Sequence, residues 1–148
     1  MKVYLASPFF NEEELKIYNE VIDLLRSEDD LSVFVPREHT IPNAWDLPNH
    51  IWGENVFAVD YLAITKCDVV VVLNFGMYSD SGTAWECGCA FALGKKVVNV
   101  LCGAEDEEYS IMMVNGTTAT MTLDELRYNH LKYCIEFEKD TNRKISQK

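Results

Sequence analysis

Residues 68–73, with the sequence DVVVVL, decide the fold that this chain is expected to adopt. Four consecutive valines followed by leucine are typical of a strand that is covered on both faces, as in a parallel sheet. Four more apolar runs are expected to form strands, at residues 2–6, 32–35, 96–101 and 117–121. The sequence therefore predicts a sheet of five strands.

Segments with helical periodicity separate these strands. Leu15, Tyr18, Ile22 and Leu25 repeat at helical spacing, and Asn11 is a suitable cap for that helix. Further helices are expected at residues 52–63, with an apolar stripe of Trp52, Val56, Val59 and Ala63, and at 83–93 and 123–137; 37–48 is expected to be a loop. The alternation predicts an α/β fold: a doubly wound five-stranded parallel sheet in a flavodoxin-like three-layer α/β/α arrangement. The 148 residues fit a single domain, 1–148, with a polar tail from about residue 139.

The chain is strongly acidic, with a formal net charge of −11. That charge repels phosphate backbones and anionic lipids, so neither nucleic acid nor a membrane is an expected partner. No apolar run is long enough to cross a bilayer. The opening MKVYLASPFF breaks at Pro8 and is followed by three glutamates, which argues against a signal peptide.

The five cysteines indicate a reducing compartment. Their number is odd and most have apolar neighbours, so we expect reduced thiols and a cytoplasmic location. Cys87 and Cys89 are two positions apart and would point to opposite sides of a helix. No second Cys or His pair has zinc-binding spacing, and no metal site is expected.

Three loops are expected to form the ligand site. In doubly wound sheets ligands bind beyond the carboxyl ends of the strands, where residues 7–10, 37–40 and 74–86 should converge. The first of these loops lacks glycine, which excludes the dinucleotide and phosphate-loop motifs. No Gly-x-Ser-x-Gly nucleophile motif occurs either.

Glu86 is the main catalytic candidate in the third loop. Near the start of a helix the dipole favours an ionised carboxylate, so Glu86 is expected to be an anion at neutral pH. Such an anion suits attack on an electrophilic carbon; alternatively, it only complements the helix end. Gly82 would allow a close backbone approach to a ligand or a positive φ.

Other candidates each allow two interpretations. Asp60 is either a solvated flank of its helix or an inward-facing acid whose pKa is raised by burial. Tyr4 either orients Glu86 or is a core tyrosine. Phe9 and Phe10 either stack on a flat heteroaromatic ring or belong to the core. His39 lies in the second loop and is a weak signal for catalysis.

Several segments resemble the nucleoside 2-deoxyribosyltransferase (N-deoxyribosyltransferase) family. They are SPFFN, PREH, WGENVFAVD, YSDSGTAWECGCAFALGK and SIMM. The resemblance extends from residue 2 to about 126, and residues 78–95 are its most specific part. It implies the doubly wound fold and transfer of a 2-deoxyribosyl group from one nucleobase to another, without a cofactor.

The resemblance also assigns roles. Glu86 corresponds to the catalytic glutamate, Asp60 and Asp80 to two assisting aspartates, and Tyr4 to the tyrosine that orients the nucleophile. Phe9, with Phe10 beside it, corresponds to the aromatic residues that pack against the base. His39 and Gly82 are further candidates for substrate contacts.

Family hexamers built from dimers imply a homo-oligomer with shared active sites. Members commonly carry an asparagine before a Leu-Met pair, which contacts the sugar hydroxyl of the neighbouring subunit. Here that position is Ser110, followed by Ile111 and Met112, which departs from the pattern. The apolar residues 111–114 are either a contact surface between subunits or an ordinary helix beneath the sheet.

The expected mechanism is double displacement. Glu86 would attack the anomeric carbon of a 2′-deoxynucleoside, and a second base would attack the covalent intermediate, with overall retention. Asp60 and Asp80 would divide protonation of the base and fixation of the sugar, in an order that stays open. Nucleoside salvage is the natural role, with 2′-deoxynucleosides and free nucleobases as partners.

Two alternatives remain. One is a nucleoside or nucleotide N-glycosidase with the same glutamate; a free nucleoside is then preferred, because Arg37 is the only cation evident among the three loops. The other is a non-catalytic flavodoxin-like binding module, which would leave three carboxylates unexplained.

Overall fold

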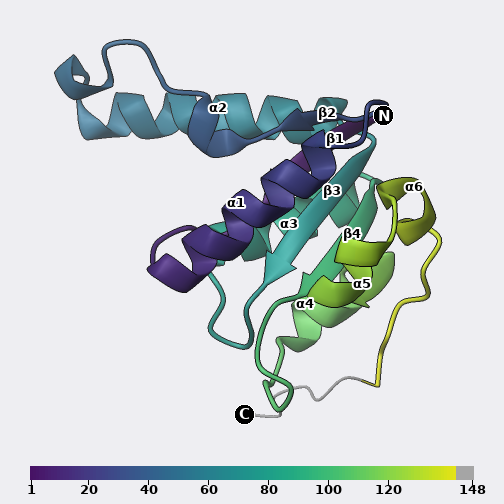
Figure 1. Ribbon diagram of the computed structural model, residues 1–148. Helices are drawn as coiled ribbons and strands as arrows, with labels where there is room; N and C mark the ends of the chain where they lie inside the picture. Colours follow the sequence, from purple (N-terminus) through teal and green to yellow (C-terminus); the bar gives the residue numbers. More distant parts are fainter. Residues whose placement is uncertain (143–148) are drawn as a thin grey trace.

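The computed structural model describes residues 1–142, and within them five parallel strands form one sheet in the order β2-β1-β3-β4-β5. The strands are β1 (Lys2–Ala6), β2 (Ser32–Phe34), β3 (Val69–Asn74), β4 (Lys96–Leu101) and β5 (Ala119–Thr122). Every neighbouring pair is parallel. The prediction of a doubly wound parallel sheet is confirmed (Figure 1).

Strand β3 lies at the centre of the sheet, and all its residues are buried. Val69, Val71 and Leu73 face one apolar cluster, while Val70 and Val72 face a second cluster on the other side. A strand buried on both faces needs apolar residues at every position, which is why the alternation of exposed strands is absent here.

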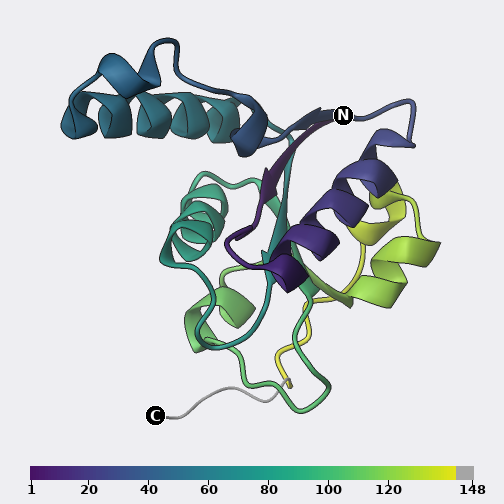
Figure 2. The ribbon, with the colours of Figure 1, turned by 60° about the vertical axis from the view of Figure 1, so that its left-hand side comes forward.

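Helices cover both faces of the sheet, as Figures 1 and 2 show. The first face carries α1 (Glu12–Arg26), α5 (Leu123–Tyr128) and α6 (Leu131–Cys134). The second face carries α2 (Asn49–Lys66), α3 (Ser81–Ala92) and α4 (Ile111–Asn115). None of these helices is both long enough and apolar enough to span a bilayer, among the residues described.

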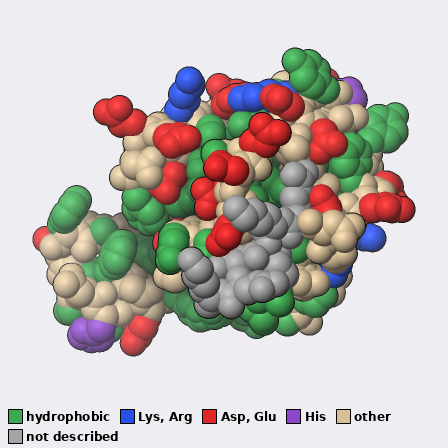
Figure 3. Space-filling view, turned by 90° about the horizontal axis from the view of Figure 1, so that it is seen from below, with side chains coloured by type: hydrophobic (Ala, Val, Ile, Leu, Met, Phe, Trp, Pro, Cys, Tyr) green, Lys and Arg blue, Asp and Glu red, His purple; other side chains and the backbone are tan. Residues whose placement is uncertain are grey.

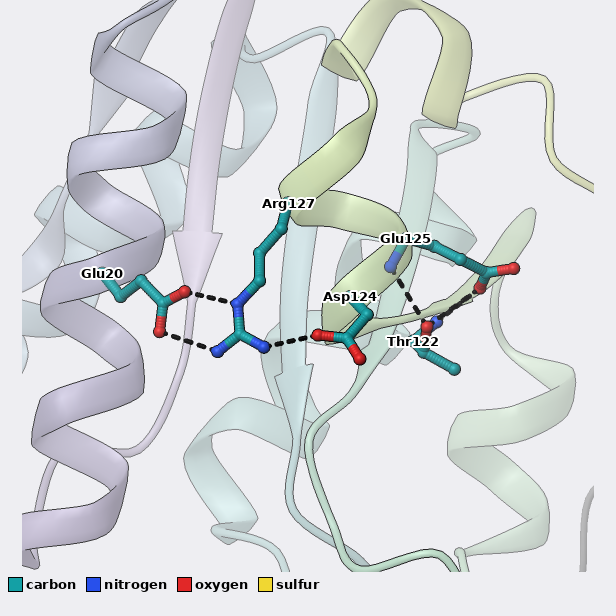
Figure 4. Close-up of polar contacts among 5 residues, drawn as sticks. All are labelled: Glu20, Thr122, Asp124, Glu125 and Arg127. Carbon is teal, nitrogen blue, oxygen red and sulfur yellow. Dashed lines mark hydrogen bonds and ion pairs between the residues drawn. The ribbon is translucent and has the colours of Figure 1, made fainter.

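Helix α1 has the predicted cap and buried stripe. The side chain of Asn11 accepts a hydrogen bond from the Glu14 amide at 2.9 Å, and Tyr18, Val21, Ile22 and Leu25 are buried. Arg127 on α5 joins the two helices, because its Nε lies 2.5 Å from Oε1 of Glu20 (Figure 4). The pair is about one-third exposed, so it contributes less than about 1 kcal/mol.

The prediction of one helix at 123–137 is wrong. It is broken into α5 and α6, because Asn129 is extended and its side chain donates to the Glu125 carbonyl at 2.7 Å. The Leu131 amide then bonds Oε1 of Glu28 instead of continuing the helix. The expected loop at 37–48 also contains two short 3₁₀ helices, η1 (Pro36–Glu38) and η2 (Ala44–Asp46).

Helix α2 differs most from expectation. The predicted stripe of Trp52, Val56, Val59 and Ala63 is not buried, and Ile64 is the one buried residue of this helix. Figures 1 and 2 show why: the first part of α2 projects beyond the sheet and packs on no other helix.

Candidate active site

The side chains of Tyr4 and Glu86 meet at the centre of the second face. Tyr4 belongs to β1 and is fully buried, and Glu86 belongs to α3, which packs on that strand. The Tyr4 hydroxyl donates a hydrogen bond to Oε1 of Glu86 at 2.5 Å. Of the two interpretations of Tyr4, the geometry agrees with the one in which it orients Glu86.

Burial raises the pKa of Glu86 to about 7, against an ordinary value of 4.5. The hydrogen bond from Tyr4 lowers this pKa, and the nearby carboxylates of Asp60 and Asp80 raise it further. Burial therefore opposes the ionised form of Glu86 that the helix dipole was expected to favour. Helix α3 begins at Ser81, so Glu86 lies in its second turn, where the dipole is weak, and desolvation dominates.

Asp60 approaches the pair from α2. Burial raises the pKa of its carboxyl above the usual range, and the charge of nearby His39 partly opposes that rise. The carboxyl group of Asp60 has no hydrogen bond to any residue within 1–142. It is therefore a partly buried carboxyl group whose oxygens are not engaged by the described residues.

Asp80 approaches from the start of α3 and is already hydrogen-bonded. As the N-cap residue, it accepts from the Thr83 amide at 2.8 Å and from the Thr83 hydroxyl at 3.1 Å, both at Oδ2. Gly82 is helical, without the positive φ considered for it. A Cβ at Gly82 would lie 2.9 Å from Oδ2 of Asp80, so the glycine leaves room for this carboxylate.

An aromatic stack flanks the carboxylates. The ring of Phe34 lies 5.5 Å from that of Tyr4 and 4.0 Å from that of His39, nearly parallel to both. A hollow of about 440 Å³ opens beside it, between β2 and α2. Phe34 was not among the predicted site residues, because its contact with Tyr4 depends on the pairing of β2 with β1.

The two phenylalanines after β1 differ from each other. Phe9 packs on Tyr18 and joins the core of the first face, whereas Phe10 is largely exposed. The guanidinium of Arg37 lies over the Phe9 ring, 5.6 Å from its centroid. Within the part of the chain that the structure describes, Arg37 has no carboxylate partner.

Ser110 and Met112 lie at the start of α4, a short helix that packs beside α3. Ser110 precedes α4 and its side chain makes no capping bond, while Met112 is 77% exposed. Neither residue forms a hydrogen bond with the carboxylates among residues 1–142. Met113 and Val114 are buried, as expected for a helix beneath the sheet. Ile111 and Met112 are exposed, as expected for a contact surface between subunits.

The arrangement suits carboxylate chemistry at a carbon centre. One carboxylate is held by a tyrosine, a second is an unbonded acid, and a third is fixed at a helix start. Acidic side chains also outnumber basic ones on the face near the carboxyl ends of the strands (Figure 3). No group of three or more His, Cys, Asp or Glu side chains within 1–142 could hold a metal ion.

Comparisons with known proteins identify similar sequences and folds. The model of the nucleoside 2-deoxyribosyltransferase family matches residues 3–140. A 2-deoxyribosyltransferase from Bacillus psychrosaccharolyticus is similar, with 30% identity, a TM-score of 0.81, and coverage of 95% of this chain and 99% of that one. No curated protein matches.

Two further solved structures show similarity of fold alone. A Clostridium botulinum CMP N-glycosidase has 24% identity and a TM-score of 0.57, covering 92% of this chain and 96% of that one. A Leishmania mexicana 2-deoxyribosyltransferase has 21% identity and a TM-score of 0.52, covering 79% of this chain and 72% of that one.

Proposed function

The chain belongs to the nucleoside 2-deoxyribosyltransferase family, and from that premise we propose that it moves 2-deoxyribose between nucleobases through a covalent bond to Glu86. Membership makes it an enzyme of the nucleoside deoxyribosyltransferase type. The observation that carries the detailed proposal is the hydrogen bond from Tyr4 to Oε1 of Glu86. It fixes the carboxylate while Oε2 has no hydrogen bond to any residue in 1–142 and is available for attack.

In the first half-reaction Oε2 of Glu86 bonds to C1′ as the bond from C1′ to the base nitrogen breaks. The base leaves with a proton, and the sugar passes through an oxocarbenium-like transition state that a fixed anion stabilises. The 2-deoxy sugar has no electron-withdrawing 2′-hydroxyl, so it forms this cation more readily than ribose. In the second half-reaction the bond to Oε2 breaks, and an acceptor base replaces it with retained configuration.

Asp60 is the proton donor in this proposal, and Asp80 holds the sugar or the other carboxylates in place. Burial raises the pKa of Asp60, which favours its protonated form, and no hydrogen bond within residues 1–142 engages its carboxyl oxygens. Asp80 uses Oδ2 to cap α3, which holds its carboxylate in a fixed position. Asp60 returns to its protonated state when the acceptor base loses its N–H proton.

The remaining candidates line the base site in this proposal. Phe10 and His39 are exposed and offer flat surfaces for a nucleobase. Phe9 packs against Phe10, with ring centroids 5.1 Å apart. Gly82 acts indirectly, through the room that it leaves for Asp80.

Transfer requires that water be kept from the glycosyl-enzyme, and a homo-oligomer with shared active sites would provide the missing cover. Ser110 and the exposed Met112 would then contact the neighbouring subunit's substrate. Salvage of 2′-deoxynucleosides in the cytoplasm is the physiological role we propose. The substrates are free 2′-deoxynucleosides and nucleobases, with no cofactor.

A hydrolase is the second candidate, and the similarity to a CMP N-glycosidase supports it at the level of fold. Incubating the protein with deoxyinosine, with and without adenine, separates the two. Transfer predicts deoxyadenosine when adenine is present and little free hypoxanthine without it. Hypoxanthine release at the same rate in both mixtures would identify a hydrolase, and no turnover in either would favour a binding module.

A further inference from the structure

The ammonium group of Lys95 joins the turn after α3 to the end of α2. Its Nζ donates hydrogen bonds to the carbonyl oxygens of Thr65 at 2.7 Å and of Cys67 at 2.9 Å. The last carbonyls of a helix have no partners within that helix, and a nearby lysine can satisfy them and complement the negative end of the helix dipole. We call these two hydrogen bonds the Lys95 bridge.

The backbone of Lys95 is fixed to α3. Gly94 has a φ of 72°, and its amide donates to the Phe91 carbonyl at 3.0 Å. The Lys95 amide donates to the Ala90 carbonyl, also at 3.0 Å. This is the Schellman arrangement that ends many helices, and glycine suits its positive φ. Lys95 is therefore bonded to α3 through its backbone and to α2 through its side chain.

Packing alone holds α2 weakly. Ile64 is its one buried residue, and the first part of the helix projects beyond the sheet (Figure 2). The ring of Phe57 meets that of Trp85 on α3 at a centroid distance of 5.3 Å, but about half of each residue is exposed. Tertiary packing normally stabilises a helix, so the position of α2 depends on the Lys95 bridge more than that of an enclosed helix would.

The two helices that the bridge joins carry the carboxylates of the candidate site. Asp60 lies five positions before Thr65 on α2, which is about 7.5 Å along a helix axis. Glu86 belongs to α3. We infer that Lys95 is a positioning residue, which holds Asp60 at its working distance from Glu86 by fixing α2 to α3. The inference rests on the proposed function, in which Asp60 protonates the leaving base.

The titration of Glu86 reports how close Asp60 lies. Burial has the largest effect on the raised pKa of Glu86, the hydrogen bond from Tyr4 opposes it, and the charges of Asp60 and Asp80 add to it. The other titratable groups that interact with Glu86 within residues 1–142 are Tyr18 on α1 and Cys89 on α3. Of all these groups, Asp60 is the one carried by α2, so a displacement of α2 acts on Glu86 through Asp60.

The first test compares base exchange by Lys95→Met, Lys95→Arg and Lys96→Met. Methionine keeps a long side chain without donors, arginine keeps donors for both carbonyls, and Lys96 is the exposed neighbour at the start of β4. Since a misplacement of about 1 Å can cost about 10²-fold in rate, kcat should fall about 10- to 100-fold for Lys95→Met, with a change in KM below about twofold. Lys95→Arg should keep most of the activity and Lys96→Met all of it.

A double-mutant cycle separates positioning of Asp60 from a general loss of stability. In an Asp60→Asn background there is no acid left to position, so adding Lys95→Met should lower kcat by less than about threefold. A general loss of stability would lower kcat equally in both backgrounds, and that result would overturn the inference.

Two further measurements need no substrate. NMR titration of isotope-labelled glutamate carboxyls should give Glu86 a lower pKa in Lys95→Met than in the wild type, and no such difference in the Asp60→Asn background. Amides of residues 57–63 should exchange at least about 10-fold faster in Lys95→Met, while β3 and β4 stay protected. An unchanged Glu86 titration or unchanged exchange in α2 would overturn the inference alone. A wild type that exchanges no bases but shows both changes would refute the proposed reaction and leave the placement of Asp60 by Lys95 supported.

Discussion

The hydroxyl of Tyr4 lies 2.5 Å from Oε1 of Glu86 and joins two residues that are 82 positions apart. Tyr4 is fully buried on a strand that pairs with β2 on one side and β3 on the other, so its hydroxyl has little freedom to move. Burial and the adjacent Glu86 raise the pKa of Tyr4 far above its usual value, which keeps it a hydrogen-bond donor. The contact stabilises the ionised form of Glu86 against a desolvation that favours the protonated form.

Replacing Tyr4 with phenylalanine should raise the pKa of Glu86 above about 7. The donated hydrogen bond favours the charged form, and one pKa unit corresponds to about 1.4 kcal/mol. The acidic limb of the pH–rate profile should therefore move to higher pH by roughly one unit, with most activity recovered at pH 9. A profile that keeps its shape while kcat falls at every pH would contradict this role.

Replacing Glu86 with glutamine should abolish base exchange and stabilise the protein at pH 8. The folded-state pKa of about 7 exceeds the unfolded value of 4.5, so the folded protein binds more protons between these values and loses stability as pH rises through them. Removing the charge should therefore recover about 2–3 kcal/mol at pH 8 and almost nothing below pH 4.

Urea denaturation at the two pH values measures this difference for Glu86→Gln. Glu105→Gln, a change in an exposed acidic loop, serves as the matched control and should change neither activity nor stability. A Glu86→Gln variant that is less stable than the wild type at pH 8 would show that burial of the ionised Glu86 carboxylate does not destabilise the folded protein.

Substitutions of Asp60 and of Asp80 should have different effects on activity and stability. Asp60→Asn should lower exchange by about 10²–10⁴-fold, and least for donors whose base leaves readily without a proton. Asp80→Ala should lose about 1 kcal/mol of stability, because it removes the cap of α3. The two variants are compared by measuring kcat for donors whose leaving bases differ in pKa, and by measuring the melting temperature. If kcat depends on the pKa of the leaving base in the same way in both variants, Asp60 is not the specific proton donor.

Gly82→Ala tests the positioning of Asp80 without touching its carboxylate. The new Cβ would lie 2.9 Å from Oδ2, so the aspartate must move away from the Thr83 amide. The loss of the cap and the gain in helix propensity are each about 1 kcal/mol and should nearly cancel in stability. We expect at least a tenfold loss of exchange at an almost unchanged melting temperature; full activity would show that this position of Asp80 is not required.

The sequence predicted the parts of the fold that depend on strong local patterns. The valines of β3 and the cap at Asn11 needed no knowledge of distant residues, and both predictions are confirmed. The break at Asn129 was missed because it depends on Glu28, which lies 103 positions from Leu131. The exposure of α2 was missed because apolar spacing shows which residues can be buried, not whether a neighbour exists to bury them.

The candidate site shows the same division. Residue types and family resemblance singled out Tyr4, Asp60, Asp80 and Glu86, and the geometry brings them together. The raised pKa of Glu86 was not predicted, because it depends on burial and on the carboxylates of Asp60 and Asp80. Phe34 was missed because its contact with Tyr4 requires β2 to pair with β1.

The most direct test of the central claim is to trap the intermediate on Glu86. The protein is mixed with deoxyinosine without an acceptor base, quenched in acid within seconds, and analysed by intact-mass and peptide mass spectrometry. The account predicts a mass increase of one 2-deoxyribosyl group on the peptide containing Glu86, which disappears when adenine is added before the quench. Base exchange without any such adduct, or with the adduct on another residue, would contradict it.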